Sequence, residues 1–272
     1  MDNLIGPEQA ERLLDDVCEI AVRASAAILA IPPLQAEQQT KDDQSPVTKA
    51  DKASEGIILE GLTRLSPGIP IISEESAESA PSRVEMSCYV VDPLDGTKEF
   101  LAGRDEYTVC IGLVTRGLPV AGVIAAPRQG LLWRGVIGGK AERLRVDFST
   151  GVFSERTVVH ARRAPADLVA AISRTHLDPN SEAFLSRLKV GKRYGCGSAV
   201  KFCHLAQGDA DVYPRLAPTS EWDIAAGCAI LVAAGGKVTD PKGGELRFAC
   251  GAEKFRVPGF IAWGDPSIAK IS

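Results

Sequence analysis

The chain has 272 residues, with 31 Lys and Arg residues against 35 Asp and Glu residues and a formal net charge of −4. Hydrophobic residues make up 45% of the sequence and charged residues 24%, which is typical of a globular protein and excludes intrinsic disorder. The acidic balance excludes a polybasic binder of nucleic-acid polymers or membrane surfaces, because a negatively charged protein repels phosphate groups.

The first predicted elements are two helices. Apolar residues recur at helical spacing over residues 8–31, and Pro32 and Pro33 end this helix. Thr48 is placed to cap a second helix, which continues to a Ser-Pro-Gly turn at residues 66–68. A polar loop separates the two helices.

After the second helix the sequence becomes rich in β-forming residues. The short β-rich runs are Ile69–Ile72, Tyr89–Val91, Tyr107–Val114, Val120–Ala125 and Leu131–Val136. Turn signals at residues 117–119 and 128–130 separate the last three runs. This pattern predicts an antiparallel meander.

The second half of the chain predicts mixed helices and strands. Residues 166–173 fit either a strand or a helix, and a helix is expected after Gly197-Ser198. A longer helix is predicted from Asp223 to Ala234, closed by two glycines. The order of elements favours an α+β fold with layered helices and sheets over a regular βαβ repeat.

A break in the pattern at residues 147–151 predicts a boundary between two closely packed halves. We place the boundary near residues 148–156, which divides the chain into an N-terminal α+β subdomain, 1–150, and a C-terminal α/β subdomain, 151–272.

Neither a membrane segment nor a disulfide framework is predicted. The longest uncharged stretches, 24–36 and 224–236, have 13 residues each, whereas a spanning helix needs about 20. The acidic start lacks the basic region of a signal peptide. Seven dispersed cysteines without CxxC spacing predict reduced, mostly buried thiols, and with only three histidines they argue against a zinc site. We therefore expect a cytoplasmic protein.

Candidate functional residues are most concentrated in the segment Asp92-Pro93-Leu94-Asp95-Gly96-Thr97. Asp92 is expected at the end of a buried strand, and Pro93 fixes a tight path that brings Asp95 back near it, so that two like charges need a cation. Gly96-Thr97 then opens a short helix, 98–101, whose free N–H groups suit a phosphate. A capped turn explains the same residues, so both interpretations remain open.

Three further acids are ambiguous singly and more informative together. Glu74 directly follows the apolar run 69–72, where a solvated acidic turn is the alternative. Asp223 is expected in the first turn of an apolar helix, where the helix dipole explains it, and Asp51 follows Thr48 at capping-box spacing. A set of oxygen donors without Cys or His favours Mg²⁺ over Ca²⁺ or Zn²⁺. Beside a helix start for phosphate, it predicts metal-assisted phosphoester hydrolysis.

The motifs DPLDGTKEF (residues 92–100) and WDIAAG (residues 222–227) resemble those of the inositol monophosphatase superfamily of lithium-sensitive, Mg²⁺-dependent phosphatases. Within this superfamily the chain is most similar to the CysQ-type 3′(2′),5′-bisphosphate nucleotidases. The segments that carry this similarity are Lys98-Glu99-Phe100, GSAVKFC (197–203), YPR (213–215) and PTSEWD (218–223). The similarity extends from about residue 13 to residue 260.

The resemblance implies a layered α-β-α-β-α sandwich and a set of residue roles. The implied ligands of two or three Mg²⁺ ions are Glu74, Asp92, the carbonyl of Leu94, Asp95 and Asp223. The scissile phosphate would bind to Asp95, Gly96 and Thr97. Asp51 would hydrogen-bond Thr97, and this pair together with Glu74 would orient and deprotonate the attacking water. No covalent phosphoenzyme is implied, in agreement with the absence of a Cys or His from the phosphate loop.

The resemblance also implies contacts to a nucleotide. Ser198, Lys201, Arg215 and Asp223 match positions that contact the substrate, and His176 would stack on or hydrogen-bond the nucleotide. Each has a simpler explanation: Ser198 as the cap of the following helix, Lys201 and Arg215 as solvated surface charges, and His176 as a structural residue.

The implied activity is hydrolysis of the 3′-phosphate of adenosine 3′,5′-bisphosphate to AMP and phosphate, within sulfur metabolism. Inositol monophosphatase or fructose-1,6-bisphosphatase activity is the alternative, because Ile224 follows Asp223 where many nucleotidases have Thr. A catalytically silent, metal-dependent sensor is a different class, and the full set of carboxylates argues against it. The implied partner is a small phosphate ester rather than a nucleic-acid polymer. We expect a monomer or homodimer, with peripheral attachment to the inner face of the membrane left open.

Overall fold

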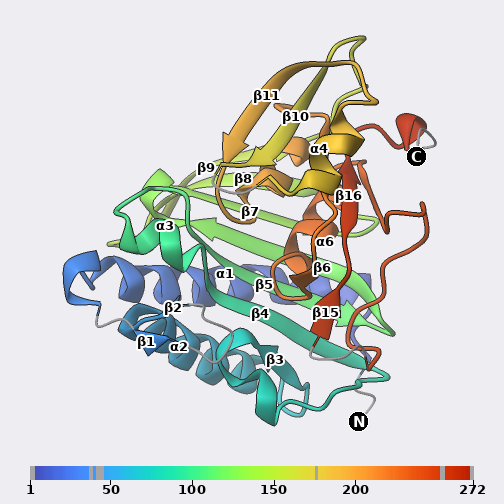
Figure 1. Ribbon diagram of the computed structural model, residues 1–272. Coiled ribbons are helices and arrows are strands. Elements are labelled where there is room, and N and C mark those ends of the chain that lie inside the picture. The colour runs from blue at the N-terminus through green and yellow to red at the C-terminus, as the bar shows by residue number, and fades with distance from the viewer. Residues whose placement is uncertain (1–3, 37–38, 41–45, 175–176, 252–254, 270–272) are drawn as a thin grey trace.

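Figure 1 shows the computed structural model of the chain, which describes residues 4–36, 39–40, 46–174, 177–251 and 255–269. Helices and sheets alternate in five layers, α-β-α-β-α, as the resemblance implies. Two helices cover the outer face of a larger sheet, two lie between the sheets, and one packs on the smaller sheet. The predicted α+β sandwich is therefore confirmed.

The outer layer consists of the two helices predicted first. α1 (Pro7–Leu29) and α2 (Lys49–Leu65) pack against each other and against one face of the larger sheet. Thr48 caps α2, and its side chain and that of Asp51 form a capping box. The short elements η1 (Pro33–Gln35), β1 (Gln39–Thr40) and β2 (Pro46–Val47) connect the helices.

The larger sheet has seven strands in sequence order. They are β3 (Ile71–Ser73), β4 (Ser87–Asp95), β5 (Thr108–Thr115), β6 (Leu118–Ala126), β7 (Leu131–Val136), β8 (Ala141–Asp147) and β9 (Val152–Val159). β3 pairs parallel with β4, and each later pair is antiparallel, which confirms the predicted meander. The short helices η2 (Glu74–Ser79), α3 (Thr97–Leu101) and η3 (Pro127–Gln129) connect these strands.

The larger sheet continues across the position where the sequence predicts a boundary. Residues 148–151 form the turn between β8 and β9, which are paired, so this sheet ends at Val159 rather than near residue 150. The side chain of Asp147 accepts the backbone N–H of Ser149 at 2.9 Å, a local bond typical of turns. The polar residues that interrupt the sequence pattern are thus a hairpin turn.

The smaller sheet has the strand order β11 (Val190–Cys196), β10 (Leu168–Ser173), β12 (Val212–Arg215), β16 (Phe260–Trp263) and β14 (Lys237–Thr239). Residues 166–173, whose sequence fits either a strand or a helix, thus contain the strand β10. The helices of this half are α4 (Pro179–Leu185), α5 (Val200–Ala206) and α6 (Ala225–Ala233), and the remaining short elements are β13 (Thr219–Ser220), β15 (Arg256–Val257) and η5 (Pro266–Ile268). Because α6 begins at Ala225, Asp223 lies in the turn before it and not in its first turn.

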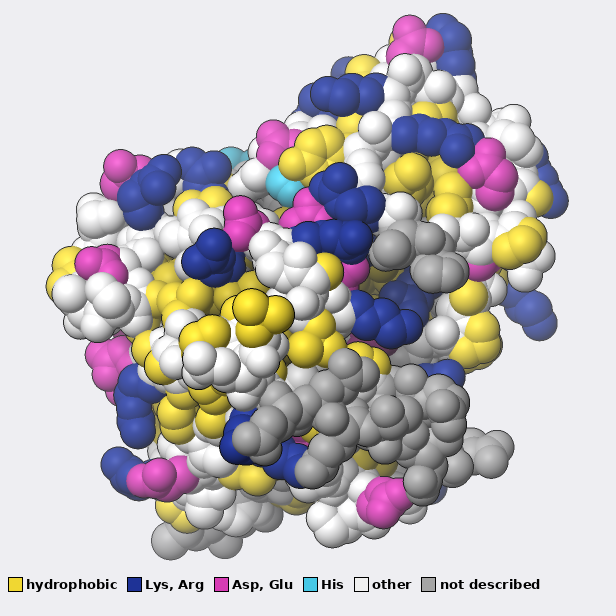
Figure 2. All heavy atoms as spheres, turned by 60° about the vertical axis from the view of Figure 1, so that its left-hand side comes forward, with side chains coloured by type: hydrophobic (Ala, Val, Ile, Leu, Met, Phe, Trp, Pro, Cys, Tyr) yellow, Lys and Arg dark blue, Asp and Glu magenta, His cyan; other side chains and the backbone are white. Residues whose placement is uncertain are grey.

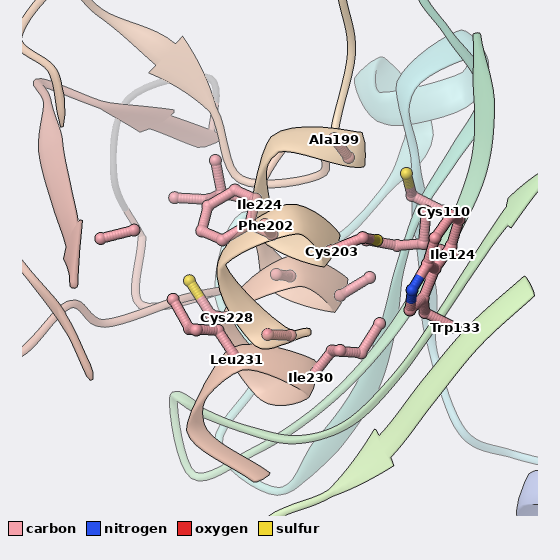
Figure 3. Close-up of a cluster of buried hydrophobic side chains, with 14 of the residues drawn as sticks. Cys110, Ile124, Trp133, Ala199, Phe202, Cys203, Ile224, Cys228, Ile230 and Leu231 are labelled. Carbon is pink, nitrogen blue, oxygen red and sulfur yellow. The ribbon is translucent and has the colours of Figure 1, made fainter. Parts of the chain in front are cut away.

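The strands of both sheets bury one face toward the central layer. In β4, Val90 packs toward α5 and α6, whereas Tyr89 and Val91 pack toward α1 and α2, as the two-residue period of a strand requires. Figure 3 shows the central cluster. Its labelled side chains are Cys110, Ile124 and Trp133 from the larger sheet and Ala199, Phe202, Cys203, Ile224, Cys228, Ile230 and Leu231 from α5, α6 and the residues adjoining them. Because both sheets pack against α5 and α6, this layer joins the two halves.

The cysteines agree with the prediction of mostly buried thiols. All seven cysteines are free thiols, and six of them are buried. Within the described ranges, no helix combines the length and apolar character needed to cross a membrane.

Gly122 of β6 allows the close approach of α6, and its replacement should destabilise the fold. A Cβ at Gly122 would lie 2.2 Å from the backbone oxygen of Ala226. Since the obstacle is backbone, we expect Gly122→Ala to lower the free energy of unfolding by about 1–3 kcal/mol. Urea unfolding would measure this. Gly56→Ala is the matched control, because a Cβ there meets nothing within 4 Å, and it should be neutral or stabilise α2 by up to about 1 kcal/mol. Equal stability of Gly122→Ala and the wild type would contradict the prediction.

Candidate active site

The end of β4 is the centre of the predicted site. Asp92 pairs with Cys110 and Asp95 with Thr108, so β4 contains one residue more than β5 between these pairs. This bulge lets the strand continue past Pro93, which lacks an N–H. The expectation that Asp92 ends the strand is therefore wrong, because β4 extends to Asp95. The hydroxyl of Ser54 donates to the carbonyl of Pro93 at 2.7 Å and fixes the bulge to α2.

Two acids at this end of the sheet are held by the backbone and by threonine hydroxyls. Oδ1 of Asp92 accepts the N–H of Leu94 at 3.0 Å. Oδ2 of Asp95 accepts the N–H of Ala199 and the hydroxyl of Thr108, the latter at 3.3 Å. In each carboxylate the hydrogen bonds from the described residues fall on one oxygen, which orients the group and leaves its second oxygen to act as a ligand.

Asp223 is held in the same way from the other half of the chain. Its Oδ2 accepts the backbone N–H of Ser220 at 3.1 Å and the hydroxyl of Thr219. These donors precede Asp223 in the chain and belong to β13, so the carboxylate is oriented by its own turn rather than by α6.

The predicted carboxylates lie close enough together to repel one another. Asp92 is 1% exposed, and burial raises its pKa well above the ordinary value. Negative charges raise the pKa of Asp92 further, in the order Glu74, Asp95, Asp223 and Asp51. Buried acids that repel in this way are stabilised by a cation.

Asp95 lies between this acidic group and two cations. Burial, followed by the charge of Asp223, raises the pKa of Asp95 to about 7. The charges of Lys201 and Arg215 and the hydrogen bond from Ala199 lower it in part. The site therefore has an acidic side and a basic side that meet at Asp95.

The raised pKa of Asp95 predicts that the metal-free protein loses stability as the pH rises. The folded carboxyl keeps its proton up to about pH 7, whereas the unfolded one ionises near 3.8, so the folded state binds more protons between these values. The protonated Asp95 therefore stabilises the folded state fully below the unfolded pKa of 3.8. This contribution to the free energy of unfolding is lost as the pH rises through the folded pKa of about 7, by up to about 1 kcal/mol per pH unit. Urea unfolding in EDTA from about pH 5 to pH 8 would measure it. Asp95→Asn should show a shallower pH dependence, and identical slopes would contradict the prediction.

Asp51 contacts both a helix cap and the start of α3. Its Oδ2 accepts the N–H and the hydroxyl of Thr48, at 2.8 and 2.6 Å. Its Oδ1 accepts the hydroxyl of Thr97 at 3.1 Å. The capping box and the implied bond to Thr97 are therefore both present. Because Thr97 donates its proton to Asp51, its oxygen can accept a hydrogen bond from a water molecule.

The donor set suits a hard divalent cation. The predicted ligands are carboxylates and one carbonyl, that of Leu94, which are the oxygen donors that Mg²⁺ prefers. Glu74 begins η2 directly after β3, and Leu94 is 1% exposed. In the described part of the chain, no three Asp, Glu, His or Cys side chains are already grouped closely enough to hold a metal ion. The chemistry and mutual repulsion of these residues fit Mg²⁺, and the ligand assignments remain predictions.

A hollow of about 270 Å³ lies beside the acids, between the start of α3 and the loop that precedes α5. It brings together six residues predicted from both halves of the sequence, namely Asp95, Gly96, Ser198, Lys201, Arg215 and Asp223. Figure 2 shows basic and acidic side chains interspersed over the visible face rather than one large basic patch. A hollow of this size suits a small anion better than a polymer.

The structure does not support the simpler explanations of Ser198 and Lys201, and their binding roles remain predictions. The N-cap of α5 is Ala199, so Ser198 does not cap this helix. The hydroxyl of Ser198 is buried without a hydrogen-bond partner among the described residues, and its backbone has a left-handed φ of 47°. Lys201 is 4% exposed, and its Nζ donates to the carbonyls of Ser198 at 2.6 Å and Cys196 at 3.4 Å. Lys201 is thus a buried cation and not a solvated surface charge.

The other residues predicted to contact the nucleotide are Arg215 and His176. Arg215 is half-buried in the wall of the hollow. Burial lowers its pKa, but Tyr213, Asp223 and Asp95 outweigh burial and raise the pKa above its ordinary value. His176 lies outside the described residues. The hollow also includes Lys98 and Glu99, which belong to a segment that carries the resemblance but have no predicted role of their own. Ser173, at the end of β10, and Tyr213, in β12, line it too, and neither has a predicted role in the site.

The fold and the site together define the protein class. The sequence pattern of the inositol monophosphatase family matches residues 10–263, so the chain belongs to this family. The 3′(2′),5′-bisphosphate nucleotidase CysQ of Salmonella typhimurium is 42% identical over 253 residues, which cover 91% of this chain and 98% of that protein. CysQ of Escherichia coli K12 is 39% identical with the same coverage. The predicted resemblance is confirmed.

Solved structures agree with this assignment. CysQ from Bacteroides thetaiotaomicron, described as a bacterial member of the inositol monophosphatase family, matches with a TM-score of 0.75 and 32% identity, over 91% of this chain and 95% of that chain. Inositol monophosphatase from Anabaena matches with a TM-score of 0.74 and 27% identity, over 96% and 94%. Both branches of the family therefore share this fold.

Proposed function

We propose that the chain is a Mg²⁺-dependent phosphatase that hydrolyses the 3′-phosphate of adenosine 3′,5′-bisphosphate to AMP and phosphate. The observation that carries this proposal is a hollow where Asp95 and Asp223, which belong to the acidic group around Asp92, meet the buried Lys201 and the half-buried Arg215. A substrate with two phosphates would bind one of them through Mg²⁺ on the acidic side of the hollow and the other on the basic side. The nucleotidase relatives with about 40% identity support the choice of substrate.

In this proposal the chain binds its cations through oxygen atoms. The ligands would be Glu74, Asp92, the Leu94 carbonyl, Asp95 and Asp223. When bound, Mg²⁺ would make an attacking water more acidic and neutralise charge on the phosphate and on the leaving 3′-oxygen. The backbone and hydroxyl donors on Asp92, Asp95 and Asp223 fix one oxygen of each carboxylate in advance, which lowers the cost of ordering the site.

Asp51 and Thr97 would move the proton of the attacking water. The Thr97 oxygen would accept that proton while its own passes to Oδ1 of Asp51, which already accepts the hydroxyl at 3.1 Å. Glu74 would orient the same water. The N–H groups of Gly96 and Thr97 would hold the phosphate at the start of α3, where backbone donors are not used within the helix.

The basic side of the hollow would bind the rest of the nucleotide. Arg215 would pair with the 5′-phosphate, since a guanidinium can donate two parallel hydrogen bonds to it. Lys201 would contribute charge while it holds the carbonyl of Ser198. The buried Ser198 hydroxyl would find a partner on the adenosine, and His176 would stack on or hydrogen-bond the nucleotide. The proposal places the enzyme in the cytoplasm and in sulfur metabolism.

A substrate panel tests this proposal. Phosphate release from adenosine 3′,5′-bisphosphate, inositol 1-phosphate and fructose 1,6-bisphosphate would be measured with Mg²⁺, with EDTA and with added Li⁺. We expect the highest kcat/KM on the nucleotide, no turnover in EDTA and inhibition by millimolar Li⁺. A preference for the inositol ester would overturn the nucleotidase assignment and leave the phosphatase class intact. Binding without turnover of any ester would instead favour a silent sensor.

Arg215→Gln should weaken binding only of substrates that carry the second phosphate. Loss of a charge-assisted hydrogen bond costs about 1.5–3 kcal/mol, so KM for adenosine 3′,5′-bisphosphate should rise about 10- to 100-fold. KM for adenosine 3′-monophosphate, which lacks the 5′-phosphate, should change little. Initial-rate kinetics on this pair of substrates would measure the difference. An equal rise for both would show that Arg215 does not recognise the 5′-phosphate.

A further inference from the structure

The loop Gly197–Ala199 connects the two halves of the site. The N–H of Ala199 donates to Oδ2 of Asp95, across 104 residues of sequence. Ser198 in the middle of the loop has a left-handed φ of 47°. Residues other than glycine rarely adopt this backbone conformation unless surrounding contacts hold it. The direction of the Ala199 N–H therefore depends on contacts that hold this loop in place.

Glu106 supplies one of these contacts from outside the hollow. Its Oε2 accepts the N–H of Gly197 at 3.0 Å. Glu106 lies just before β5 and does not line the hollow itself. Lys201 holds the loop from the other side through the carbonyl of Ser198. Gly197 at the start of the loop and Ser198 in its middle are thus fixed by one acidic and one basic side chain.

Arg174 fixes Glu106 in turn. Its Nε donates to Oε2 of Glu106 at 3.0 Å and its second nitrogen donates to Oε1, so the pair is bidentate. Burial would raise the pKa of Glu106, but the hydrogen bonds from Arg174 and Gly197 outweigh it and hold the pKa below its usual value. Glu106 is therefore an ionised anchor between the end of β10 and the loop.

The backbone of Glu106 also touches both loops of the site. A Cβ on Gly197 would lie 3.0 Å from the carbonyl oxygen of Glu106, and one on Gly96 would lie 3.2 Å from the same atom. These spacings leave little room for Gly197 or Gly96 to move toward Glu106. Glu106 therefore lies close to Gly96, which precedes α3, and to the loop Gly197–Ala199.

We propose that Glu106 is a positioning residue that fixes the loop Gly197–Ala199, so that Ala199 holds one oxygen of Asp95 and leaves the other as a ligand for Mg²⁺. The inference rests on the proposed function, because it assigns Glu106 an effect on cation binding through Asp95. A purely structural ion pair between the two halves would stabilise the fold without changing the affinity for Mg²⁺.

Mg²⁺ binding in the absence of substrate separates these two roles. The full chain, Glu106→Gln and Glu106→Ala would be stripped of metal and titrated with MgCl₂ by calorimetry, with thermal unfolding measured in parallel. The matched control is Glu182→Gln, which breaks another bidentate pair, that of Glu182 with Arg193 at 2.7 and 2.6 Å, away from the site. Arg174→Gln removes the ion pair that fixes Glu106 but keeps the Glu106 carboxylate, so it should also raise the Kd for Mg²⁺, and it is measured in case Glu106→Ala does not fold.

We expect Glu106→Ala to raise the Kd for Mg²⁺ about tenfold, the lower end of the range for residues that support metal ligands. Glu106→Gln should have a smaller effect, because its amide oxygen can still accept the Gly197 N–H. Glu182→Gln should bind Mg²⁺ as the wild type does. Wild-type affinity in Glu106→Ala and Arg174→Gln would overturn the inference and leave the proposed function standing. A wild type that does not bind Mg²⁺ would overturn both.

Discussion

Replacing Asp95 by asparagine should lower the kcat for phosphate release by about 10³-fold or more. Asparagine keeps the size of the side chain, and its amide oxygen can accept the hydrogen bonds from Ala199 and Thr108. It removes the negative charge that would bind Mg²⁺. Metal ions contribute several kcal/mol to phosphoryl chemistry, and about 4 kcal/mol corresponds to about 10³-fold in rate.

The stability of Asp95→Asn distinguishes a functional loss from misfolding. Because Asp95 is a repelled, buried acid with a pKa of about 7, its neutralisation should not destabilise the metal-free protein near neutral pH. Asp167→Asn is the control, since Asp167 is exposed and pairs with Lys189 at 2.8 Å, and it should retain full activity. Activity of Asp95→Asn within tenfold of the wild type would show that the site is misplaced.

Local patterns were sufficient to predict the outer helices and the meander. The period of apolar residues and the Pro32-Pro33 stop predict α1, and Thr48 predicts the start of α2. Short hydrophobic runs with turn residues between them predict β5, β6 and β7. These elements follow from nearest-neighbour chemistry, namely capping, chain breaks and side-chain period, which a single sequence contains.

The errors have a common physical cause. β4 continues through Pro93 because a bulge supplies a position that needs no N–H, and the bulge is fixed by Ser54 from a distant helix. β9 is almost wholly exposed, so it lacks the alternating pattern that predicts a strand, and its pairing with β8 decides its structure. Tertiary contacts determine both features.

In the candidate site, too, some residues are predicted from the local sequence and others are brought together only by the fold. The acids of the DPLDGT segment are predicted from sequence because they are adjacent to one another. The ion pair between Glu106 and Arg174 spans 68 residues, and no spacing rule connects them. From sequence alone, helix capping explains Ser198 and surface exposure explains Lys201. Only the fold shows that both side chains are buried. Contacts that orient a ligand from a distance require the fold.

Thr97→Val should lower kcat by about 10²- to 10³-fold with little change in stability. Valine has nearly the shape of threonine but removes the hydroxyl that donates to Oδ1 of Asp51. In the proposed mechanism this hydroxyl takes the proton of the attacking water, and general base catalysis typically contributes about 10²–10⁴-fold. Thr97→Ser keeps the hydroxyl and should retain most of the activity. Steady-state kinetics and urea unfolding of the two variants would measure these effects.

Thr48→Ala is the complementary variant, because Thr48 and Thr97 bind opposite oxygens of the same carboxylate. Loss of the Thr48 cap should lower the free energy of unfolding by about 1 kcal/mol. It should leave kcat almost unchanged, since Oδ1 of Asp51 still faces Thr97. If Thr97→Val instead kept its kcat, Asp51 would serve the helix cap alone, and the water would have to lose its proton to another group such as Glu74. The two threonine variants thus separate the structural role of Asp51 from its catalytic role.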